Sequence, residues 1–280
     1  MLIDAHVHIV ADDEATYPLN PARIQPAGVS QTWYREAPVT AEGLLGLMAA
    51  AGVDKAMVVQ PMTAYQYDNS YAADSVHAAS DRLVGVAIVE ADGPNASERL
   101  RYWVDRRGMR GVRLFATAEG KALDLSSPAV EALLTQADAL RIPVCVQMNF
   151  AAVPQLRRMV EHFPRLPIVL DHLAASHIEN GLAPELIRDL ESLAPYANAH
   201  MKLTTLNFDA VTQTQGSIAE FLRWLVRVFG ARRIMWGSNF PATNDRTYTA
   251  LVDTARDVLA SLPEEDQGWI LGGTAAALWP

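Results

Sequence analysis

The chain has 280 residues, of which 50% are hydrophobic and 20% are charged, so it is long enough to bury a large core. Its formal net charge of −9 opposes nucleic-acid binding, and no apolar run approaches the length that crosses a bilayer. Its one cysteine, Cys145, excludes an intrachain disulfide. With no basic and apolar leader pattern at the start, we expect a cytoplasmic protein.

Short apolar runs rich in Val, Ile and Leu predict eight β-strands. These runs lie at residues 2–8, 53–60, 83–90, 109–115, 142–148, 167–173, 199–206 and 233–239. Runs that are apolar on both faces are typical of parallel strands covered by helices. Most of them are separated by segments with helical periodicity, so the chain alternates between strand and helix.

Several of the intervening segments carry helix start and stop signals. Capping residues predict helices that begin after Thr40, Asn95, Ser127 and Ser217, and glycines predict helix ends at Gly52, Gly108 and Gly230. Eight strands alternating with helices in a chain of this size predict a (β/α)8 barrel, which we assign to residues 1–280 as a single domain. The alternative is an open doubly wound sheet, but no Gly-x-Gly-x-x-Gly motif follows a strand.

The stretch from Val10 to Pro38 is the main irregularity. It is rich in proline and has little periodicity. Loops of this length in compact domains are usually functional or disordered, and its aromatic residues, Tyr17, Trp33 and Tyr34, favour a packed lid.

Polar residues end most of the predicted strands, where the chemistry of a barrel is placed. They are Asp4, His6, His8, Gln60, Arg113, Gln147, Asn149, Asp171, His172, Lys202, Asn207, Ser238 and Asn239. Alternate residues of a strand share a face, so Asp4, His6 and His8 are expected to point together, whereas Asp171 is expected to point away from its neighbour His172.

Four motifs lie in order at predicted strands one, six and eight and near the end of the sequence. They are Ile3-Asp4-Ala5-His6-Val7-His8, Val169-Leu170-Asp171-His172-Leu173, Met235-Trp236-Gly237-Ser238-Asn239-Phe240-Pro241 and Gly272-Gly273-Thr274-Ala275-Ala276-Ala277-Leu278-Trp279. Together they resemble the amidohydrolase superfamily. More narrowly, they resemble its branch of barrel hydrolases that includes lactonases for sugar lactones, pyrone dicarboxylate and muconolactones.

The resemblance implies that His6, His8, His172 and Asn239 are the catalytic residues. In the family an aspartate stands at the position of Asn239, and an amide cannot act as a general base. Metal-dependent relatives commonly place a histidine on the fifth strand, where this chain has Gln147. His6, His8 and His172 remain as ligands for one zinc or manganese ion, but we favour a metal-free site.

The expected partner is a small anionic lactone. Arg113 suits a substrate carboxylate, or alternatively an ion pair within the barrel, and Lys202 assists an anionic substrate or neutralises Asp4. The further candidates for substrate binding are Gln60, Gln147, Tyr67 and Arg246.

The sequence thus predicts a hydrolase that opens the ring of a carboxylate-bearing or sugar-acid lactone. Because Asn239 replaces the family's base, a lactone isomerase that needs only proton transfer between oxygens is an alternative. A decarboxylase and a non-catalytic protein that binds a small acid rank lower.

Overall fold

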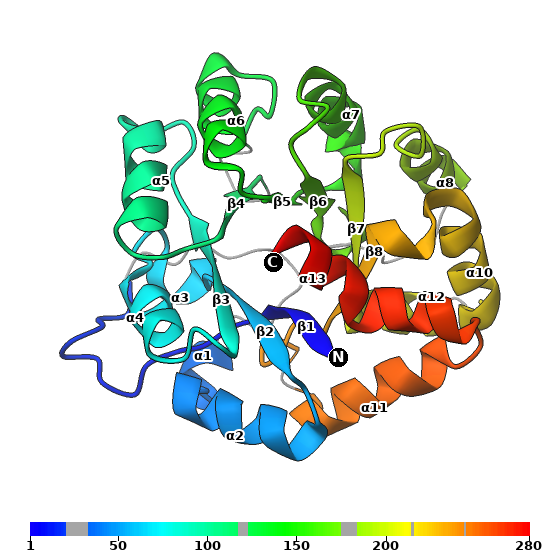
Figure 1. Ribbon diagram of the computed structural model, residues 1–280, viewed down its shortest axis with the longest axis horizontal. Coiled ribbons are helices and arrows are strands. Elements are labelled where there is room, and N and C mark those ends of the chain that lie inside the picture. The colour runs from blue at the N-terminus through cyan, green and yellow to red at the C-terminus, as the bar shows by residue number, and fades with distance from the viewer. Residues whose placement is uncertain (21–32, 117–122, 175–183, 214–215, 244) are drawn as a thin grey trace.

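Eight parallel strands pair in chain order to form the centre of the fold (Figure 1). The computed structural model describes residues 1–20, 33–116, 123–174, 184–213, 216–243 and 245–280. The strands are β1 (Ile3–Val7), β2 (Lys55–Val59), β3 (Leu83–Ile88), β4 (Gly111–Phe115), β5 (Val144–Gln147), β6 (Ile168–Leu170), β7 (Ala199–Thr204) and β8 (Ile234–Gly237). Each lies within one of the predicted apolar runs.

The barrel closes between β8 and β1. The backbone N–H of Asn239 donates to His6 O at 2.8 Å, and that of His8 donates to Phe240 O at 2.8 Å. The predicted (β/α)8 barrel is therefore confirmed, and the doubly wound sheet is wrong, because an open sheet has no pairing between its first and last strands.

Helices surround the strands in the order expected of this fold (Figure 1). They are α1 (Trp33–Glu36), α2 (Ala41–Ala51), α3 (Met62–Tyr65), α4 (Ser70–Ala78), α5 (Ala96–Asp105), α6 (Pro128–Leu140), α7 (Val153–His162), α8 (Pro184–Glu191), α9 (Thr205–Gln213), α10 (Ile218–Phe229), α11 (Tyr248–Leu259), α12 (Glu264–Gly268) and α13 (Thr274–Leu278). None in the described part of the chain is long and apolar enough to cross a membrane.

The predicted caps are largely present. The side chains of Thr40, Ser127 and Ser217 accept hydrogen bonds from backbone N–H groups in the first turns of α2, α6 and α10. Asn95 precedes α5 as predicted, but its positive φ of 61° leaves it without a capping hydrogen bond, and α5 ends three residues before Gly108.

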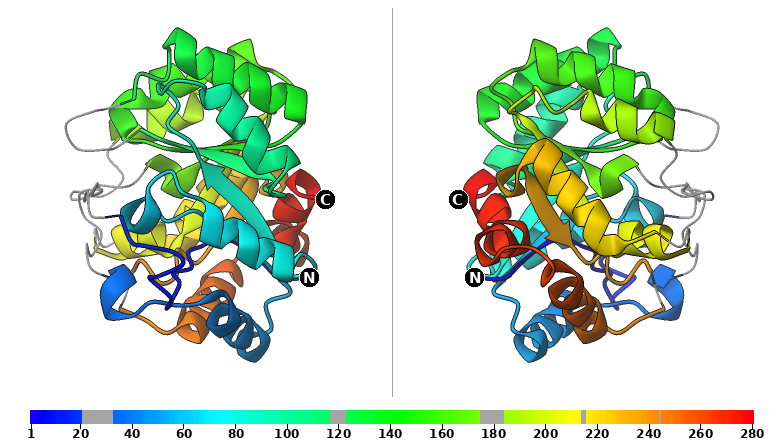
Figure 2. Two further views of the ribbon diagram at one scale, coloured as in Figure 1. Left: turned by 90° about the vertical axis from the view of Figure 1, so that its left-hand side faces the viewer. Right: turned by 90° about the vertical axis from the view of Figure 1, so that its right-hand side faces the viewer.

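The strands separate the two largest apolar clusters of the core, as the double-sided apolar strands predict. The larger cluster lies between the strands and the outer helices. A smaller cluster fills the barrel with residues from several strands, including Ile3, Met57, Val169 and Met235, and α13 contributes Ala275 to it. The helix α13 thus covers one end of the barrel, where both termini lie (Figure 2).

The lid predicted for residues 10–38 stays a prediction, because residues 21–32 lie outside the described residues. Trp33 and Tyr34 are buried and pack in one cluster with Val10 and Tyr65. These aromatic residues therefore join the described ends of the segment to the loop after β2.

Candidate active site

Three histidines gather at the carboxyl ends of the barrel strands. His6 and His8 lie on and just after β1, and His172 follows β6. The ring centroids of His6 and His8 are 4.9 Å apart, and those of His6 and His172 are 4.7 Å apart. All three side chains are buried. The tertiary structure therefore joins residues that are more than 160 positions apart in the chain.

Gly237 lets β8 approach His6. A Cβ atom placed on Gly237 would lie 2.6 Å from the Cβ of His6 and 2.9 Å from its backbone nitrogen, both well inside contact distance. Because a glycine has no Cβ, the strands can close here without moving His6 away from the other histidines.

Asp4 does not share the face of His6 and His8. The pairing of β1 with β2 is irregular between Asp4 and Val7, and both chain neighbours of Asp4 belong to the apolar cluster inside the barrel. The Asp4 carboxylate accepts hydrogen bonds from the backbone N–H groups of His6 at 3.0 Å and Ser238 at 2.8 Å. Burial raises its pKa to about 6. The prediction that the three residues point together is thus wrong for Asp4, because a bulge interrupts the alternation.

The chain turns sharply after β6. His172, Leu173 and Ala174 all have positive φ values, of 54°, 53° and 59°. In this conformation the two-residue alternation of a strand no longer holds, and the side chains of Asp171 and His172 are both buried in the site. The expectation that Asp171 points outward is therefore wrong.

Asp171 lies between two buried cations. Its Oδ2 accepts a hydrogen bond from Arg113 Nε at 2.7 Å, and its Oδ1 lies 2.8 Å from Lys202 Nζ. Gln147 Oε1 accepts a hydrogen bond from the same guanidinium. Although burial opposes it, the attraction of Lys202 and Arg113 holds the pKa of Asp171 well below its usual range. Arg113 thus forms the ion pair that the sequence left as an alternative, and Lys202 neutralises Asp171 instead of Asp4.

Hydrogen bonds set the tautomers of two histidines. His8 Nδ1 lies 2.8 Å from the carbonyl oxygen of Val59, which can only accept, so Nδ1 carries the proton. His172 Nδ1 lies 3.0 Å from Thr204 Oγ1, and the Thr204 hydroxyl donates to Asn207 Oδ1 at 3.4 Å. His172 Nδ1 therefore donates as well. In both rings Nε2 keeps a free lone pair.

The three imidazoles are neutral at pH 7. Burial and the charge of Arg113 lower the pKa of His8 to about 4, and burial lowers the pKa of His172 to about 3 despite Asp171. Burial and the charge of Lys202 hold the pKa of His6 well below its usual range. Neither ring nitrogen of His6 has a hydrogen-bond partner among the described residues. The site therefore offers neutral proton acceptors in an electropositive surrounding.

His6, Asp171 and His172 are arranged like the ligands of a metal site, but the charge around them differs from that of a metal site. Donor atoms of His6, Asp171 and His172 lie within 4.8 Å of one another, and His8 is not among them, unlike the set predicted from the sequence. The unpartnered nitrogens of His6 suit a metal ligand. However, the single carboxylate already faces Arg113 and Lys202, so a divalent cation would enter a site with excess positive charge. The spacing of these three donors thus suits a metal ion, whereas the excess positive charge beside them opposes one.

Arg246 lies on the loop after β8 but is already ion-paired. Its Nη1 donates to Asp209 Oδ1 at 3.0 Å, and its Nη2 lies 2.9 Å from Asp245 Oδ2. These hydrogen bonds raise the pKa of the guanidinium. Two carboxylates thus already pair with the Arg246 guanidinium, which the sequence suggested as a binding group for an anionic substrate.

Gln60 and Tyr67 lie at the loop after β2. Gln60 Nε2 donates to the backbone oxygen of Asp68 at 2.6 Å, while its Oε1 is buried and has no partner among the described residues. Tyr67 is half-buried and packs with a small apolar cluster that contains Ile88 and Phe115. Gln60 therefore holds the loop that carries Tyr67.

Asn239 stands beside His6 at the end of β8. Its backbone N–H donates to His6 O at 2.8 Å, its side chain is buried, and its φ of 59° lies in the left-handed region that asparagine tolerates better than most residues. The position that the family gives to aspartate is thus held in the site by the backbone pairing of β8 with β1.

Sequence reasoning missed two residues that contact the histidines. Thr204, the last residue of β7, is the partner of His172, and its place directly at a strand end was the available signal. Trp33 stacks against His8 with ring centroids 5.7 Å apart and an interplanar angle of 30°. No local pattern connects Trp33 with His8, because that contact depends on how the long loop folds back.

Comparison with known proteins agrees with this geometry. The model of the amidohydrolase family matches residues 3–280. An L-fucono-1,5-lactonase from Burkholderia ambifaria is 29% identical over 205 residues, which are 70% of this chain and 68% of that protein.

Two solved structures share the fold over nearly the whole chain. The crystal structure of a candidate 2-pyrone-4,6-dicarboxylic acid hydrolase from Pseudomonas putida has a TM-score of 0.78 and 24% identity, and it covers 99% of this chain and 97% of its own. That of an amidohydrolase from Burkholderia multivorans with bound zinc has a TM-score of 0.76 and 18% identity, covering 100% and 99%.

Proposed function

The chain belongs to the amidohydrolase family, and we propose that it hydrolyses the ring ester of a small sugar-acid lactone at the histidine cluster. The observation that carries the proposal is the pair of neutral imidazoles with fixed tautomers, His8 and His172, beside buried cations. The similarity to an L-fucono-1,5-lactonase supports the lactone as substrate.

His172 is the proposed general base. Its Nδ1–H is held by Thr204, so Nε2 is free to accept a proton from the water that attacks the lactone carbonyl carbon. The low pKa of His172 in the free protein rises during this step, because negative charge develops on the substrate beside the ring. The ring of His6 lies 4.7 Å away, centroid to centroid, and its nitrogens have no partner within the described chain, so it is free to orient water or substrate. His8 is held in the same way by Val59 and completes the wall.

The cations below the histidines stabilise the negative charge that develops on the carbonyl oxygen. Arg113 and Lys202 together outweigh the single charge of Asp171, and all three side chains are buried, where charges are weakly screened. The field is fixed by ion pairs and needs no rearrangement during the reaction. Gln147 holds the Arg113 guanidinium in place.

The ring then opens by cleavage of the bond between the acyl carbon and the ring oxygen. The proton taken by His172 passes to the leaving ring oxygen, so one water is consumed and a hydroxy acid is formed. Asn239 offers an amide donor at the position where the family has a carboxylate, and it can hold the substrate but cannot take a proton. We therefore propose a reaction that does not depend on a divalent metal ion, as the charge of the site favours.

The test is turnover of L-fucono-1,5-lactone and related sugar lactones, measured by acid release in a pH-stat, with and without a chelator. In water labelled with oxygen-18, hydrolysis places one label in the product carboxylate, whereas isomerisation between ring sizes places none. A protein that turns over lactones only with a bound stoichiometric metal would contradict the proposed mechanism. A protein that turns over no lactone would contradict the function.

The catalytic role of the histidine has its own control. His172→Ala is expected to lower kcat by a factor of about 10² to 10⁴, the usual contribution of general base catalysis. Arg99, an exposed residue of α5, provides the surface variant Arg99→Gln, which is expected to keep full activity.

A further inference from the structure

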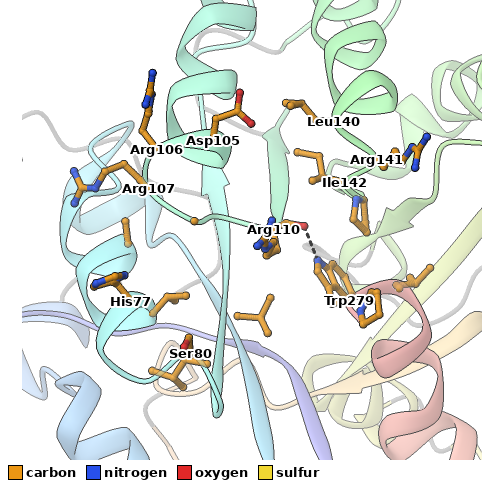
Figure 3. A pocket seen from close by; sticks show the side chains of 18 of the residues that line it. His77, Ser80, Asp105, Arg106, Arg107, Arg110, Leu140, Arg141, Ile142 and Trp279 are labelled. Atoms are coloured by element: carbon orange, nitrogen blue, oxygen red, sulfur yellow. Dashed lines mark hydrogen bonds between the residues drawn. The ribbon is translucent and has the colours of Figure 1, made fainter.

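A cavity lies at the end of the barrel opposite the histidines. It has a volume of about 890 Å³ and is lined by residues at the starts of the strands and the ends of the helices between them (Figure 3). Lys55 begins β2, Leu83 begins β3 and Arg110 precedes β4. Cavities of this size are typical of sites for small molecules.

The cavity is positively charged in a protein whose net charge is −9. Its cationic lining residues are Lys55, Arg106, Arg107, Arg110 and Arg141, and its acidic ones are Asp74 and Asp105. Arg107 is paired with Asp74 at 2.8 Å. For the other four cations, the described part of the chain supplies no ion-pair or side-chain hydrogen-bond partner. More cations than carboxylate side chains therefore line this one cavity.

Helix dipoles account for only some of these cations. Arg106 and Arg141 follow α5 and α6 directly, where a positive charge favours the carboxyl end of a helix. Lys55 and Arg110 stand at the amino ends of strands, where no helix end requires them. Their charges are thus available to a ligand.

Arg141 has a backbone conformation that disfavours any residue with a Cβ atom. It caps α6 with a φ of 55°, in the left-handed region, whereas the corresponding cap of α2 is Gly52 with a φ of 69°. Glycine is the usual residue at such a position, because a Cβ atom crowds the left-handed backbone. An arginine at this position therefore lowers the stability of the fold, which supports a role for its side chain at the cavity.

The wall of the cavity is fixed. Trp279 is buried, and its Nε1 donates to the backbone oxygen of Arg110 at 3.1 Å, which appears as the dashed line in Figure 3. A Cβ atom on Gly111 would lie 3.2 Å from that Nε1, so the indole packs directly on the start of β4. The backbone that carries Arg110 is thus held in place by Trp279.

We propose that this cavity binds a small organic anion that carries two or more carboxylate or phosphate groups. Figure 3 places Arg110 near the middle, Arg106 and Arg107 on one side of it, and Arg141 on the other. A ligand with separated anionic groups can meet both sides, and guanidinium groups bind carboxylates and phosphates through paired hydrogen bonds. The site lies at the opposite end of the barrel from the histidines, so its ligand does not compete with a lactone.

The experiment is calorimetric titration of the whole protein with citrate and with pyrophosphate, and with acetate and chloride at equal ionic strength. We expect citrate or pyrophosphate to bind at one site and acetate and chloride to show no saturable binding. In the double variant Arg110→Gln with Arg141→Gly, the Kd is expected to rise by at least about tenfold, because two charge-assisted contacts are lost. Glycine suits the backbone at position 141, so the variant is expected to fold.

The controls separate this site from the catalytic one and from general surface charge. Arg99→Gln is expected to keep the Kd within about twofold, and His172→Ala, which changes only the opposite end of the barrel, is expected to do the same. Binding that is lost in His172→Ala but kept in the double variant would place the anion at the histidines and overturn the proposal. Equal losses in Arg99→Gln, or no binding of either anion, would overturn it as well.

Discussion

The two ends of the barrel differ in whether their charged side chains form ion pairs within the protein. At the carboxyl ends of the strands, Asp171 is fully buried between Arg113 and Lys202, and the neighbouring histidines are neutral. At the amino ends, Arg110 and Arg141 are exposed and form no ion pair with the described part of the chain. A buried charge needs a partner inside the protein, whereas water solvates an exposed one. The buried end can therefore hold a fixed catalytic field, and the exposed end can leave its charges free for a ligand.

Removing the buried carboxylate is expected to have the largest effect. Asp171→Asn leaves Arg113 and Lys202 buried without a counter-charge and is expected to lower the free energy of unfolding by about 3–5 kcal/mol. The more exposed ion pair between Arg107 and Asp74 offers the matched variant Asp74→Asn, which is expected to lower the free energy of unfolding by less than about 1 kcal/mol. Urea denaturation of both variants measures the difference, and equal losses would contradict the contrast between the two ends.

Acid is expected to destabilise the histidine end next most strongly. The folded pKa values of His8 and His172, about 4 and about 3, lie below the ordinary value of 6.5. As the pH falls below 6.5, the unfolded chain binds protons that the folded protein does not bind, so stability is lost. Asp4, with its pKa raised to about 6, opposes this, because its contribution to stability is lost as the pH rises. These three groups together give a net loss of about 2 kcal/mol between pH 7 and pH 5, and the lowered pKa values of His6 and His200 add to the loss in the same direction.

Urea denaturation at several pH values tests this expectation. The double variant Arg110→Gln with Arg141→Gly should show the same loss, since it changes no titrating group at the histidine end. An unfolding free energy that stays flat from pH 7 to pH 5 would show that the histidines are not held neutral.

The tautomer of His172 is expected to control kcat through a residue that does not touch substrate. Thr204→Val removes the acceptor of the Nδ1 proton, and we expect kcat to fall by about 10- to 100-fold, as for other partners that orient an active histidine. Thr204→Ser keeps the hydroxyl and should restore most of the activity. A valine variant with the kcat and pH profile of the native protein would remove Thr204 from this role.

The smallest effect is expected at the exposed end. Arg141→Gly relieves the left-handed backbone and is expected to raise the free energy of unfolding by up to about 1 kcal/mol. Chemical denaturation measures the change. A variant that is clearly less stable would mean that the Arg141 side chain stabilises the fold itself. The cations of the exposed end would then be structural, like those of the buried end.

Local sequence patterns were sufficient to predict the fold and much of the histidine cluster. Apolar runs that alternate with capped helical segments predict a (β/α)8 barrel, because burial on both faces constrains the residues of every strand. The same rule places His6, His8, His172 and Arg113 at strand ends, and the structure brings them together.

Local pattern failed where the backbone departs from regular geometry. The bulge in β1 separates Asp4 from the histidines, and the left-handed residues after β6 turn Asp171 inward. Alternation holds only in a regular strand, so neither departure was visible in the order of residues.

The eight strands, the ring of helices and the histidines could be predicted from the order of residues, because periodicity and strand-end position are local properties. Which charges are compensated depends on the folded barrel: Asp171 pairs with Arg113 and Lys202, Asp209 and Asp245 pair with Arg246, and Arg110 and Arg141 form no ion pair among the described residues. An ion pair depends on distances between side chains that are far apart in the chain, and those distances exist only once the barrel has closed.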